Sequence, residues 1–492
     1  MSHTPICALA TGSGGAIAII RISGEGCIPI ADKIFHSYNH SPLTHTPANT
    51  IRLGVVVATD GQQIDEALFS IFQAPHSYTG EDSVEISLHA SPYIINETLH
   101  TLCAAGCRMA EPGEFTQRAF LAGKIDLSQA EAVADLIAAN TAAAHKVALS
   151  QLKGSFSSKL SRLTNDLQQA LALLELELDF DEHETMEFAD RSELRTLIQN
   201  AIQNVSALID SYATGKALKW GVPVAIVGKT NVGKSTLLNR LLRQERAIVS
   251  PIHGTTRDTI EDTITLHGVP FRFIDTAGLR NTNDTVEQIG IARTHQAIER
   301  AQIILYVFDT IPTNKEINEI RKKTDGKETI FIHNKADLLA QQQYQTEKKQ
   351  ENPNATQNPT EVKQTGFSDV SQNSTSLPHP LSHAHPTSAI FISAKNDTDL
   401  TPLEEAIYQA AHLQHWDSTE TIVTSARHHE ALCHANEALK RAETALAQTD
   451  ITPDLISEEL RLATNYLATI TGHTITPETT LQHLFSHFCV GK

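Results

Sequence analysis

The sequence predicts a multidomain chain of mixed α+β and α/β class, in which a P-loop α/β domain is inserted into a helical domain. Three observations predict this class. Short β-like runs and turns fill the first 120 residues, helical periodicity starts near Ile125, and an α/β pattern interrupts that periodicity. The 492 residues suffice for roughly three domains of ~150 residues each.

The N-terminal region, residues 1–122, is expected to be a compact α+β domain. Four short runs predict strands, and they read AIAIIRIS, IRLGVVVA, EALFSIF and DSVEISLHA. One helical segment, PYIINETLHTLCAAG, accompanies them. Strands separated by turns, with a helix to cover one face, are typical of this architecture.

Two helical regions, residues 123–217 and 413–492, flank the α/β pattern and are expected to form one helical domain. A second amphipathic run covers about 192–210, and helical periodicity returns in SARHHEALCHANEALKRAETALAQ and SEELRLATNYLATITG. Apolar residues spaced by three or four predict the buried face of one helix: Leu152, Phe156, Leu160, Leu163, Leu167, Leu171 and Leu174. The bundle therefore starts before the insertion and closes after it.

The inserted region, residues 218–412, begins with a buried-strand run, VPVAIV, and continues as alternating strands and helices. Its segment 341–388 is rich in Gln, Asn, Ser, Pro and Thr and has few large apolar residues. Such a segment cannot bury enough apolar surface to offset the entropy of ordering, so we expect a disordered insertion.

Composition excludes several classes of protein. The formal net charge of −18 argues against a general polyanion binder, so any RNA contact needs a local patch. The six cysteines fit no disulfide framework, and for Cys103 and Cys107 free thiols are favoured over zinc ligands, which indicates a reducing cytoplasm. We expect no signal peptide and no membrane span, because no apolar run approaches ~18 residues.

A phosphate-binding loop follows the first strand of the inserted region. The string GKTNVGKS, Gly228–Ser235, matches G-x-x-x-x-G-K-[S/T] and precedes the helical run TLLNRLLRQ. Glycines let backbone N–H groups surround phosphate oxygens, and the helix N-terminus adds its dipole. In this arrangement Lys234 reaches the β- and γ-phosphates and Ser235 binds Mg²⁺.

Four further motifs follow in the order expected of a guanine-nucleotide site: GTTRD, DTAG, NKAD and SAK. Thr256 of GTTRD is a second candidate Mg²⁺ ligand. Asp337 of NKAD can accept two hydrogen bonds from guanine, which adenine cannot donate. Five motifs in order predict GTP binding. A structural dimer with a degenerate site is the weaker alternative.

The group that activates water is less evident. Ras-like domains place a glutamine after DTAG, but this chain has Leu279, whose apolar side chain cannot orient water. Asp284 and Glu287 are acidic candidates in the same loop. Asn231 offers a neutral oxygen to a monovalent cation, which could offset charge that develops on the phosphates.

Several longer blocks resemble the MnmE (TrmE) family of tRNA modification GTPases: AIIRISG, SYTGEDSVEISLHA, EPGEFTQRAFLAGKIDLSQAEAVADLI and the terminal FCVGK. The resemblance covers the chain except 341–388. It implies an N-terminal folate-binding and dimerisation domain, a helical domain, and a Ras-like G domain inserted into it. Two departures are Gly12-Ser13 in place of a proline pair, and the long insertion between NKAD and SAK.

The resemblance also implies roles for individual residues. K⁺ would lie among Asn231, Ser250, Ile252 and Thr255, Mg²⁺ would be held by Ser235 and Thr256, and Glu287 would order the attacking water. The tetrahydrofolate that carries the one-carbon unit would contact Arg21, Glu85, Lys124 and Lys492. The residues expected around GTP are Asn231, Val232, Gly233, Lys234, Ser235, Thr236, Ser250, Pro251, Ile252, His253, Gly254, Thr255, Thr256, Asp275, Thr276, Ala277, Gly278, Asn334, Lys335, Asp337, Ser393, Ala394 and Lys395.

The activity implied by the resemblance is a K⁺- and Mg²⁺-dependent GTP hydrolase. Together with the FAD protein MnmG it would install an aminomethyl-type group, such as carboxymethylaminomethyl, on carbon 5 of the wobble uridine of certain tRNAs. A 5,10-methylene- or 5-formyl-tetrahydrofolate would supply the carbon, and GTP hydrolysis would drive pairing of G domains in a homodimer. The alternative is a ribosome-assembly GTPase switch, which usually carries an RNA-binding module.

The C-terminal string HFCVGK has three interpretations: a lipid-attachment box, packed core, or a tail that reaches a site. Gly491 and Lys492 break the prenylation pattern, which asks for aliphatic residues after the cysteine. We favour a tail anchored by Phe485 and Phe488, with its last residues beside the folate pocket. Cys489 is then a candidate catalytic thiol, or an inert packed one.

Overall fold

The computed structural model describes residues 4–12, 14–38, 40–180, 191–244, 262–274, 295–338, 389–396, 399–413, 421–448, 453–472, 485–486, 488 and 491. The chain divides into two compact units. The first contains Met1–Ala139, Ala144–Gly215 and Ser418–Lys492, and the second contains Asn140–Ala143 and Lys216–Asp417. The second unit is therefore inserted in the sequence of the first.

A seven-stranded sheet forms the N-terminal part of the first unit, in the order β3-β4-β5-β6-β2-β1-β7. All neighbouring strands are antiparallel except β1 and β7. Its strands are β1 (Ile6–Leu9), β2 (Ile17–Ser23), β3 (Phe35–Ser37), β4 (Thr50–Val57), β5 (Gln63–Phe72), β6 (Ser83–His89) and β7 (Arg108–Met109). The four strands predicted from sequence correspond to β2, β4, β5 and β6, whereas β1, β3 and β7 were missed because they are too short for a periodic signal.

Helices cover one face of this sheet. Helix α1 (Cys27–Lys33) and helix α2 (Pro92–Ala105) pack on the alternate side chains of β2, β5 and β6 that point to them, which include Ile20, Phe69 and Ile86. The opposite side chains of β2 and β6 include polar and charged groups, and this face meets the following helix, α3 (Glu114–Leu121).

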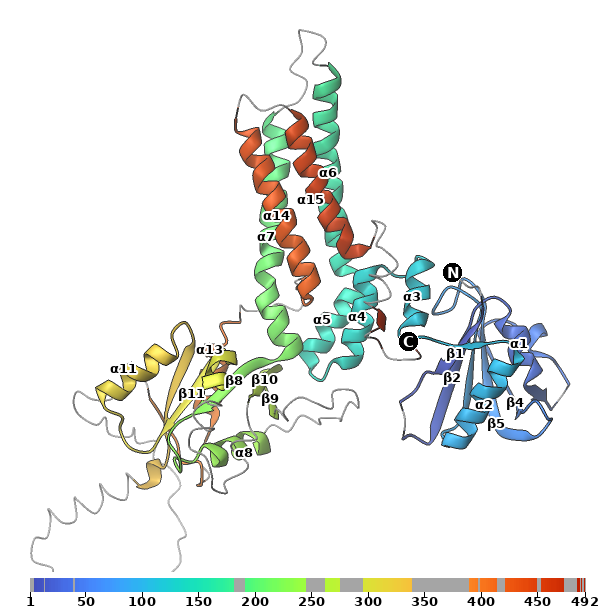
Figure 1. The fold of residues 1–492 in the computed structure, drawn as a ribbon, viewed down its shortest axis with the longest axis horizontal. Helices are drawn as coiled ribbons and strands as arrows, with labels where there is room; N and C mark the ends of the chain where they lie inside the picture. Colours follow the sequence, from blue (N-terminus) through green and yellow to red (C-terminus); the bar gives the residue numbers. More distant parts are fainter. Residues whose placement is uncertain are drawn as a thin grey trace, which may run out of the picture. The chain divides into compact units, whose positions relative to one another are not determined.

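Four long helices form the bundle of the first unit: α6 (Ser155–Phe180), α7 (Arg191–Trp220), α14 (Ala426–Leu446) and α15 (Pro453–Thr471). They lie side by side in Figure 1. Two shorter helices, α4 (Leu127–Ala138) and α5 (Ala142–Leu152), precede them. The predicted stripe on a single helix is wrong at one end: Leu152 ends α5, and Gly154, at φ +83°, separates it from α6. The other six residues lie on α6 and pack into the bundle.

The chain re-enters the bundle through a buried segment, residues 421–425. Gly215 of α7 is needed there, because a Cβ would lie 2.0 Å from the carbonyl oxygen of Val423. Gln151 donates to the carbonyl of Ile422 at 2.8 Å. One turn further, Glu131 accepts hydrogen bonds from Arg427 at 2.8 Å and from His428 at 2.9 Å, which joins α4 to α14.

The second unit is a six-stranded sheet in the order β13-β12-β11-β8-β10-β9, parallel except for β9. Its strands are β8 (Val222–Val227), β9 (Asp262–Leu266), β10 (Val269–Phe273), β11 (Ile303–Phe308), β12 (Glu328–His333) and β13 (Ile390–Phe391). The helices of this unit include α8 (Lys234–Gln244), α11 (Asn314–Lys323) and α13 (Thr401–Ala410). This is the mostly parallel sheet expected of a P-loop domain, so the predicted fold class is confirmed. The segment 341–388 lies outside the described residues.

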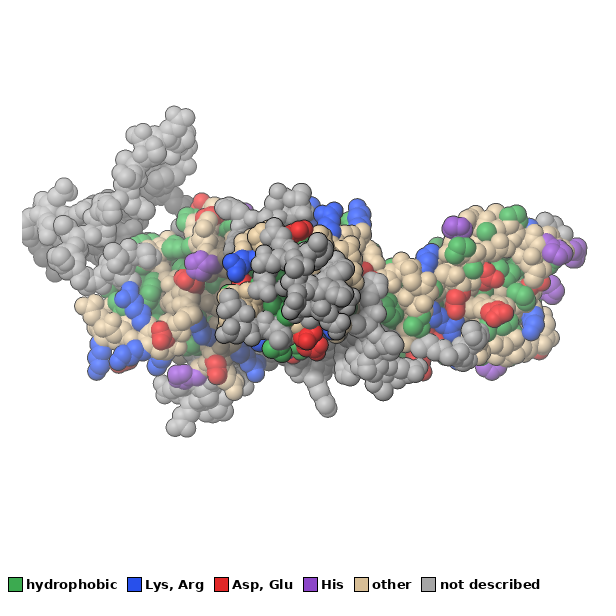
Figure 2. Space-filling model, turned by 90° about the horizontal axis from the view of Figure 1, so that it is seen from above, with side chains coloured by type: hydrophobic (Ala, Val, Ile, Leu, Met, Phe, Trp, Pro, Cys, Tyr) green, Lys and Arg blue, Asp and Glu red, His purple; other side chains and the backbone are tan. Residues whose placement is uncertain are grey.

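Acidic, basic and apolar side chains are interspersed on the face shown in Figure 2. Among the helices that the structure describes, none is long and apolar enough to cross a membrane. The cysteines in the described part of the chain are free thiols, and no group of three metal-binding side chains occurs there. Cys103 and Cys107 were expected to be free thiols on one helix. Cys103 is on α2, but Cys107 follows the end of that helix, so the expected shared helix is wrong.

Candidate functional site

The phosphate loop lies where the chain changes direction across the sheet of the second unit. Strand β8 pairs with β10 on one side and with β11 on the other. In parallel α/β sheets, ligands bind at the carboxyl ends of the strands at such a switch point. The loop after Val227 therefore has the position expected of a nucleotide site.

Two glycines of this loop lie close to neighbouring strands and loops. Gly228 has φ +154°, and a Cβ there would lie 2.1 Å from the carbonyl oxygen of Val307 on β11. Gly233 has φ +95°, and a Cβ there would lie 2.3 Å from Nδ2 of Asn334. Asn231 between them has φ +65°, a conformation that asparagine tolerates better than most residues. The loop thus has a tight backbone that side chains would obstruct.

Lys234 is held inside the loop by backbone carbonyls. Its Nζ donates to Gly228 at 2.7 Å and to Lys229 at 2.6 Å. Burial lowers the pKa of Lys234 below its ordinary value, because the charged form is less well solvated there. An anionic ligand bound at the loop would stabilise the charged form of this ammonium group. Ser235, the next residue, is half-buried and Thr236 is exposed.

Asn334 links the phosphate loop to two other loops. The side chain is 2% exposed. Its Nδ2 donates to the carbonyl of Val232 at 2.7 Å, and its Oδ1 accepts from the backbone N–H of Ala394 at 2.9 Å. Loops that follow β8, β12 and β13 are therefore joined through one side chain, and the separate motifs GKTNVGKS, NKAD and SAK form one site.

The other residues of NKAD are also ordered by contacts. Ser393 donates to Oδ1 of Asp337 at 2.7 Å, which orients that carboxylate beside the loop after β13. Lys335 has φ +60° and its Nζ donates to Asp309 at 2.7 Å. Hydrogen bonding from Lys335 lowers the pKa of Asp309 below its usual range. Sequence reasoning missed Asp309, although a polar residue directly after the buried strand IILYVF was a usable signal.

The described site residues also include Lys395, which is exposed. Leu279, Asp284 and the insertion lie outside the described residues. So do twelve of the residues predicted for the nucleotide site: Ser250, Pro251, Ile252, His253, Gly254, Thr255, Thr256, Asp275, Thr276, Ala277, Gly278 and Glu287.

A second polar site lies on the N-terminal sheet. Arg21 on β2 and Glu85 on β6 are directly opposite in the antiparallel register. Nε and Nη2 of Arg21 both contact Oε1 of Glu85, at 2.9 Å and 2.8 Å. Two residues 64 positions apart in sequence, both expected at one site, are thus paired.

Aromatic rings enclose Arg21, and sequence reasoning missed them. The guanidinium carbon lies 5.1 Å from the ring centre of Tyr78 and 5.6 Å from that of Phe115. Such cation–π contacts position a guanidinium and shield it from water. Tyr78 is further held by a 2.9 Å hydrogen bond between its hydroxyl and Thr116. Phe115 is fully buried, whereas Tyr78 is exposed, so a flat heterocyclic ligand could stack on Tyr78 and still reach the Arg21–Glu85 pair.

Lys124, the third predicted residue of this site, is exposed and donates to the carbonyl of Pro75 at 2.9 Å. Its aliphatic stem packs over Gly80, where a Cβ would lie 3.2 Å from Cγ of the lysine. The loop that carries Tyr78 and the segment that carries Lys124 are therefore in contact.

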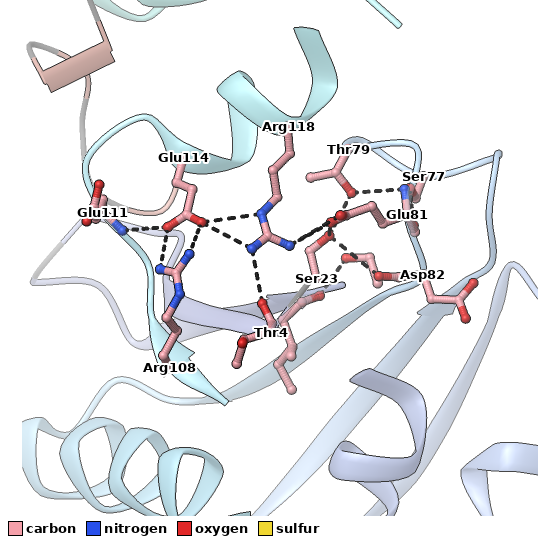
Figure 3. A network of polar contacts seen from close by, with 12 residues as sticks. Thr4, Ser23, Ser77, Thr79, Glu81, Asp82, Arg108, Glu111, Glu114 and Arg118 are labelled. Atoms are coloured by element: carbon pink, nitrogen blue, oxygen red, sulfur yellow. Dashed lines mark hydrogen bonds and ion pairs between the residues drawn. The ribbon is translucent and has the colours of Figure 1, made fainter. Parts of the chain in front are cut away.

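A network of charges fixes α3 beside this site (Figure 3). Glu114 accepts from Arg108 at 2.8 Å and from Arg118 at 3.1 Å, and Arg118 also donates to Glu81 at 3.0 Å. Burial alone would raise the pKa of Glu114, but the hydrogen bonds and charges of its partners hold it below the usual value. Since Phe115 follows Glu114 on α3, this network positions one of the rings around Arg21.

The C-terminal tail packs on the same region. Phe485 is 2% exposed and clusters with Leu127, Ala130 and Phe488. At the other end of the tail, a Cβ on Gly491 would lie 2.1 Å from the carbonyl oxygen of Leu9. Leu9 pairs with Ile20, the residue before Arg21. The phenylalanine anchor has the expected packing, whereas Cys489 and Lys492 lie outside the described residues.

Comparison with known proteins agrees with this geometry. A family model described as "MnmE helical domain" matches residues 127–489, and one described as "GTP-binding protein TrmE N-terminus" matches residues 5–124. Proteins named "tRNA modification GTPase MnmE" are 43% identical in Phocaeicola vulgatus (100% of this chain, 99% of the relative) and 44% identical in Bacteroides thetaiotaomicron (100% of both). The protein of that name in Christiangramia forsetii is 43% identical over 99% of both chains.

Among solved structures, the cytosolic domain of the T. maritima FeoB iron transporter aligns with 51% of this chain and 98% of its own. The identity is 15% and the TM-score is 0.23, which is too low to bear on the fold. The sheet order and the joined loops define the class: a P-loop nucleotide-binding domain inserted into a helical protein. Within that class, the chain belongs to the MnmE family of tRNA modification GTPases.

Proposed function

We propose that this chain is a K⁺- and Mg²⁺-dependent GTPase that acts with the FAD protein MnmG on carbon 5 of the wobble uridine of certain tRNAs. The product would be of the carboxymethylaminomethyl or aminomethyl type. The single observation that carries the proposal is the Asn334 contact, which assembles the phosphate loop and the guanine-type loops in a chain whose relatives are named tRNA modification GTPases.

The described residues fit GTP and its metal. Gly228 and Gly233 leave the backbone free of side chains where phosphates would bind, and the α8 N-terminus starts directly at Lys234. Asp337, oriented by Ser393, has a free carboxylate oxygen for guanine. Ser235 would hold Mg²⁺ together with Thr256, and Mg²⁺ would neutralise charge on the phosphates.

Of the four proposed K⁺ ligands, Asn231 lies among the described residues, where it is exposed and has a left-handed backbone conformation. Ser250, Ile252 and Thr255 would complete the set, and Glu287 would orient the attacking water. Pairing of two G domains in a homodimer would place K⁺ beside the phosphates. Hydrolysis would then open and close the pair.

The Arg21 site fits a tetrahydrofolate in its donor set. A pterin edge presents N–H groups that suit Glu85, and the anionic tail suits Arg21, Lys124 and Lys492. Tyr78, which is exposed, adds flat apolar surface for a ring. The bound 5,10-methylene- or 5-formyl-tetrahydrofolate would supply the one-carbon unit, and Cys489 would act near it as a catalytic or structural thiol.

We further propose the division into residues 1–122 for folate binding and dimerisation, 123–217 with 413–492 for the helical domain, and 218–412 for the G domain. Because the proposed substrate is tRNA, the protein would act in the cytoplasm. The ribosome-assembly alternative has no observation in its favour, since the family models match the N-terminal and helical parts as well.

Two measurements test the proposal. GTP hydrolysis by the full chain should be faster in potassium than in sodium buffer at equal ionic strength, and equal rates would remove the K⁺-dependent part. Mass spectrometry of tRNA nucleosides from a deletion strain should show loss of the wobble-uridine modification. Complementation with Cys489→Ser then tests the thiol, because an inert packed thiol predicts full rescue.

A further inference from the structure

A cavity of the first unit lies outside both sites described above. Its volume is about 450 Å³, and it opens along the first turns of α6. Most of the residues that line it are polar, and they come from α6, from α7 and from the segment before α14: Ser155, Ser158, Lys159, Arg162, Asp166, Asn204 and Thr421, with Leu163 as the apolar one. Two cations, three hydroxyls, an amide and one carboxylate therefore surround a space large enough for a phosphate group.

The two cations of this cavity, Lys159 and Arg162, both lie on α6. Lys159 and Arg162 are three residues apart on α6, so they project from the same side of the helix. Among the residues that the structure describes, neither forms an ion pair. By contrast, two arginines on other helices of the bundle are paired: Arg441 contacts Glu459 and Arg461 contacts Glu175, both at 2.8 Å. The charges of the cavity are thus available to an external anion.

The local sequence is basic in an acidic protein. Residues 136–165 contain Lys146, Lys153, Lys159 and Arg162 but no Asp or Glu, although the whole chain carries a formal charge of −18. Lys146, Lys153 and Arg162 are exposed. Asp166 is the one acid of the cavity lining and cannot neutralise two cations. This stretch is a local patch of the kind that a polyanion would need on such a protein.

The distribution of charge favours a polymer over a small anion. A single phosphate requires converging donors at one point, whereas the cations of this stretch are spread over α5, the α5–α6 turn and the start of α6. Lysine and arginine, supported by serine hydroxyls and a helix N-terminus, are the groups that contact backbone phosphates without reading sequence. These cations would therefore position a nucleic acid through its phosphates, while base recognition would occur elsewhere.

We propose that this cavity and the cations of residues 136–165 form a binding surface for the phosphate backbone of the tRNA substrate. The inference rests on the proposed function, because that function supplies the polyanion. Lys159 and Arg162 would neutralise phosphates directly, and Ser158 and Asn204 would donate hydrogen bonds to them.

The test compares tRNA binding by the full chain and by Lys159→Gln/Arg162→Gln. The probe is fluorescently labelled tRNA with an unmodified wobble uridine, titrated by anisotropy at several potassium chloride concentrations. Each neutralised phosphate contributes a slope of about −0.7 to −0.9 in log K against log salt. We expect the double variant to bind at least about ten-fold more weakly at ~0.1 M salt, with a slope shallower by about 1.5.

Two further variants serve as matched controls. Lys322→Gln/Lys323→Gln on α11 makes the same change in net charge in the second unit and should bind as the wild type does. Asp166→Asn removes the acid of the cavity and should bind more tightly. GTP hydrolysis in potassium should be unchanged in all three variants, which verifies that each is folded.

The outcomes separate the site from the function. Unchanged tRNA binding by the Lys159/Arg162 variant, or an equal loss in the α11 control, overturns the site alone. Absence of tRNA binding by the wild-type chain overturns the site together with the proposed function. If inorganic phosphate displaces tRNA at concentrations at which chloride does not, the cavity is a small-anion site, and the backbone assignment is wrong.

Discussion

The side-chain amide of Asn334 donates to the backbone carbonyl of Val232 at 2.7 Å, which ties the loop after β12 to the phosphate loop after β8. The same side chain accepts from Ala394 after β13. The shape of the phosphate loop is therefore coupled to the loops that would contact the base. A substitution that displaces any of the three loops should therefore displace the other two.

Asn334→Ala should weaken nucleotide binding and destabilise the second unit. The substitution leaves the Val232 carbonyl and the Ala394 N–H without their partner in a buried place, which costs about 2 kcal/mol of unfolding free energy. Fluorescent GTP-analogue titration and urea denaturation measure the two effects. Asn314→Ala, at an exposed position of α11, is the matched control and should change neither. Wild-type nucleotide affinity in Asn334→Ala would refute the coupling.

Gly233→Ala should weaken nucleotide binding, because the new methyl group would lie 2.3 Å from Nδ2 of Asn334. Gly268→Ala is a close control: this glycine has φ +81°, and a Cβ there has nothing within 4 Å. Both substitutions carry the cost of a left-handed residue, about 1 kcal/mol. Only the first should lose affinity, by at least about ten-fold, and equal affinities in the two variants would show that the contact does not matter.

Glu131→Gln should remove a pH-dependent part of the stability of the first unit. Burial alone would raise the pKa of Glu131, but the charges and hydrogen bonds of His428 and Arg427 lower it to about 2. A carboxylate with a depressed folded-state pKa stabilises the fold above its unfolded pKa, and that stability is lost as pH falls towards the folded value.

The stability difference between wild type and Glu131→Gln should thus be about 3 kcal/mol at neutral pH. It should shrink between about pH 5 and pH 2. Urea denaturation followed by circular dichroism measures it. Glu459→Gln, in an exposed pair with Arg441, should cost less than about 1 kcal/mol. A difference that stays constant with pH would contradict the assignment.

Gly491→Ala should weaken binding of 5-formyl-tetrahydrofolate while GTP hydrolysis is retained. Gly491 has φ +92°, and a Cβ would lie 2.1 Å from the carbonyl oxygen of Leu9, so the end of the tail would be displaced. Gly61→Ala is the control, since Gly61 has φ +84° but open space around it. Isothermal calorimetry measures the affinity, and equal binding by both variants would mean that the tail end plays no part.

Much of the fold could be predicted from the sequence because its signals are local. The strand runs that contain Arg21 and Glu85 alternate with period two, and the apolar stripe from Phe156 to Leu174 follows one helix face. The break at Gly154 was missed, because the i+4 spacing from Leu152 to Phe156 continues across it. Strands as short as β7 are stabilised by neighbours rather than by their own pattern.

The candidate sites were predictable as motifs but not as contacts. The strings around Lys234 and Asn334 indicated a nucleotide site, yet nothing in them showed that Nδ2 of Asn334 would bond to Val232. Tyr78 and Phe115 lie in separate segments and meet at Arg21 through the placement of α3. Contacts of this kind depend on register and helix placement, which long-range packing decides.

The approach of Gly491 to Leu9 brings the last residues of the chain to its first strand. This contact joins parts of the sequence that are far apart, so it closes a long loop at an entropic cost. Packing of Phe485 against Leu127 and Ala130 helps to offset that cost. The region around Arg21 therefore includes a contact of high sequence separation, a kind that slows folding.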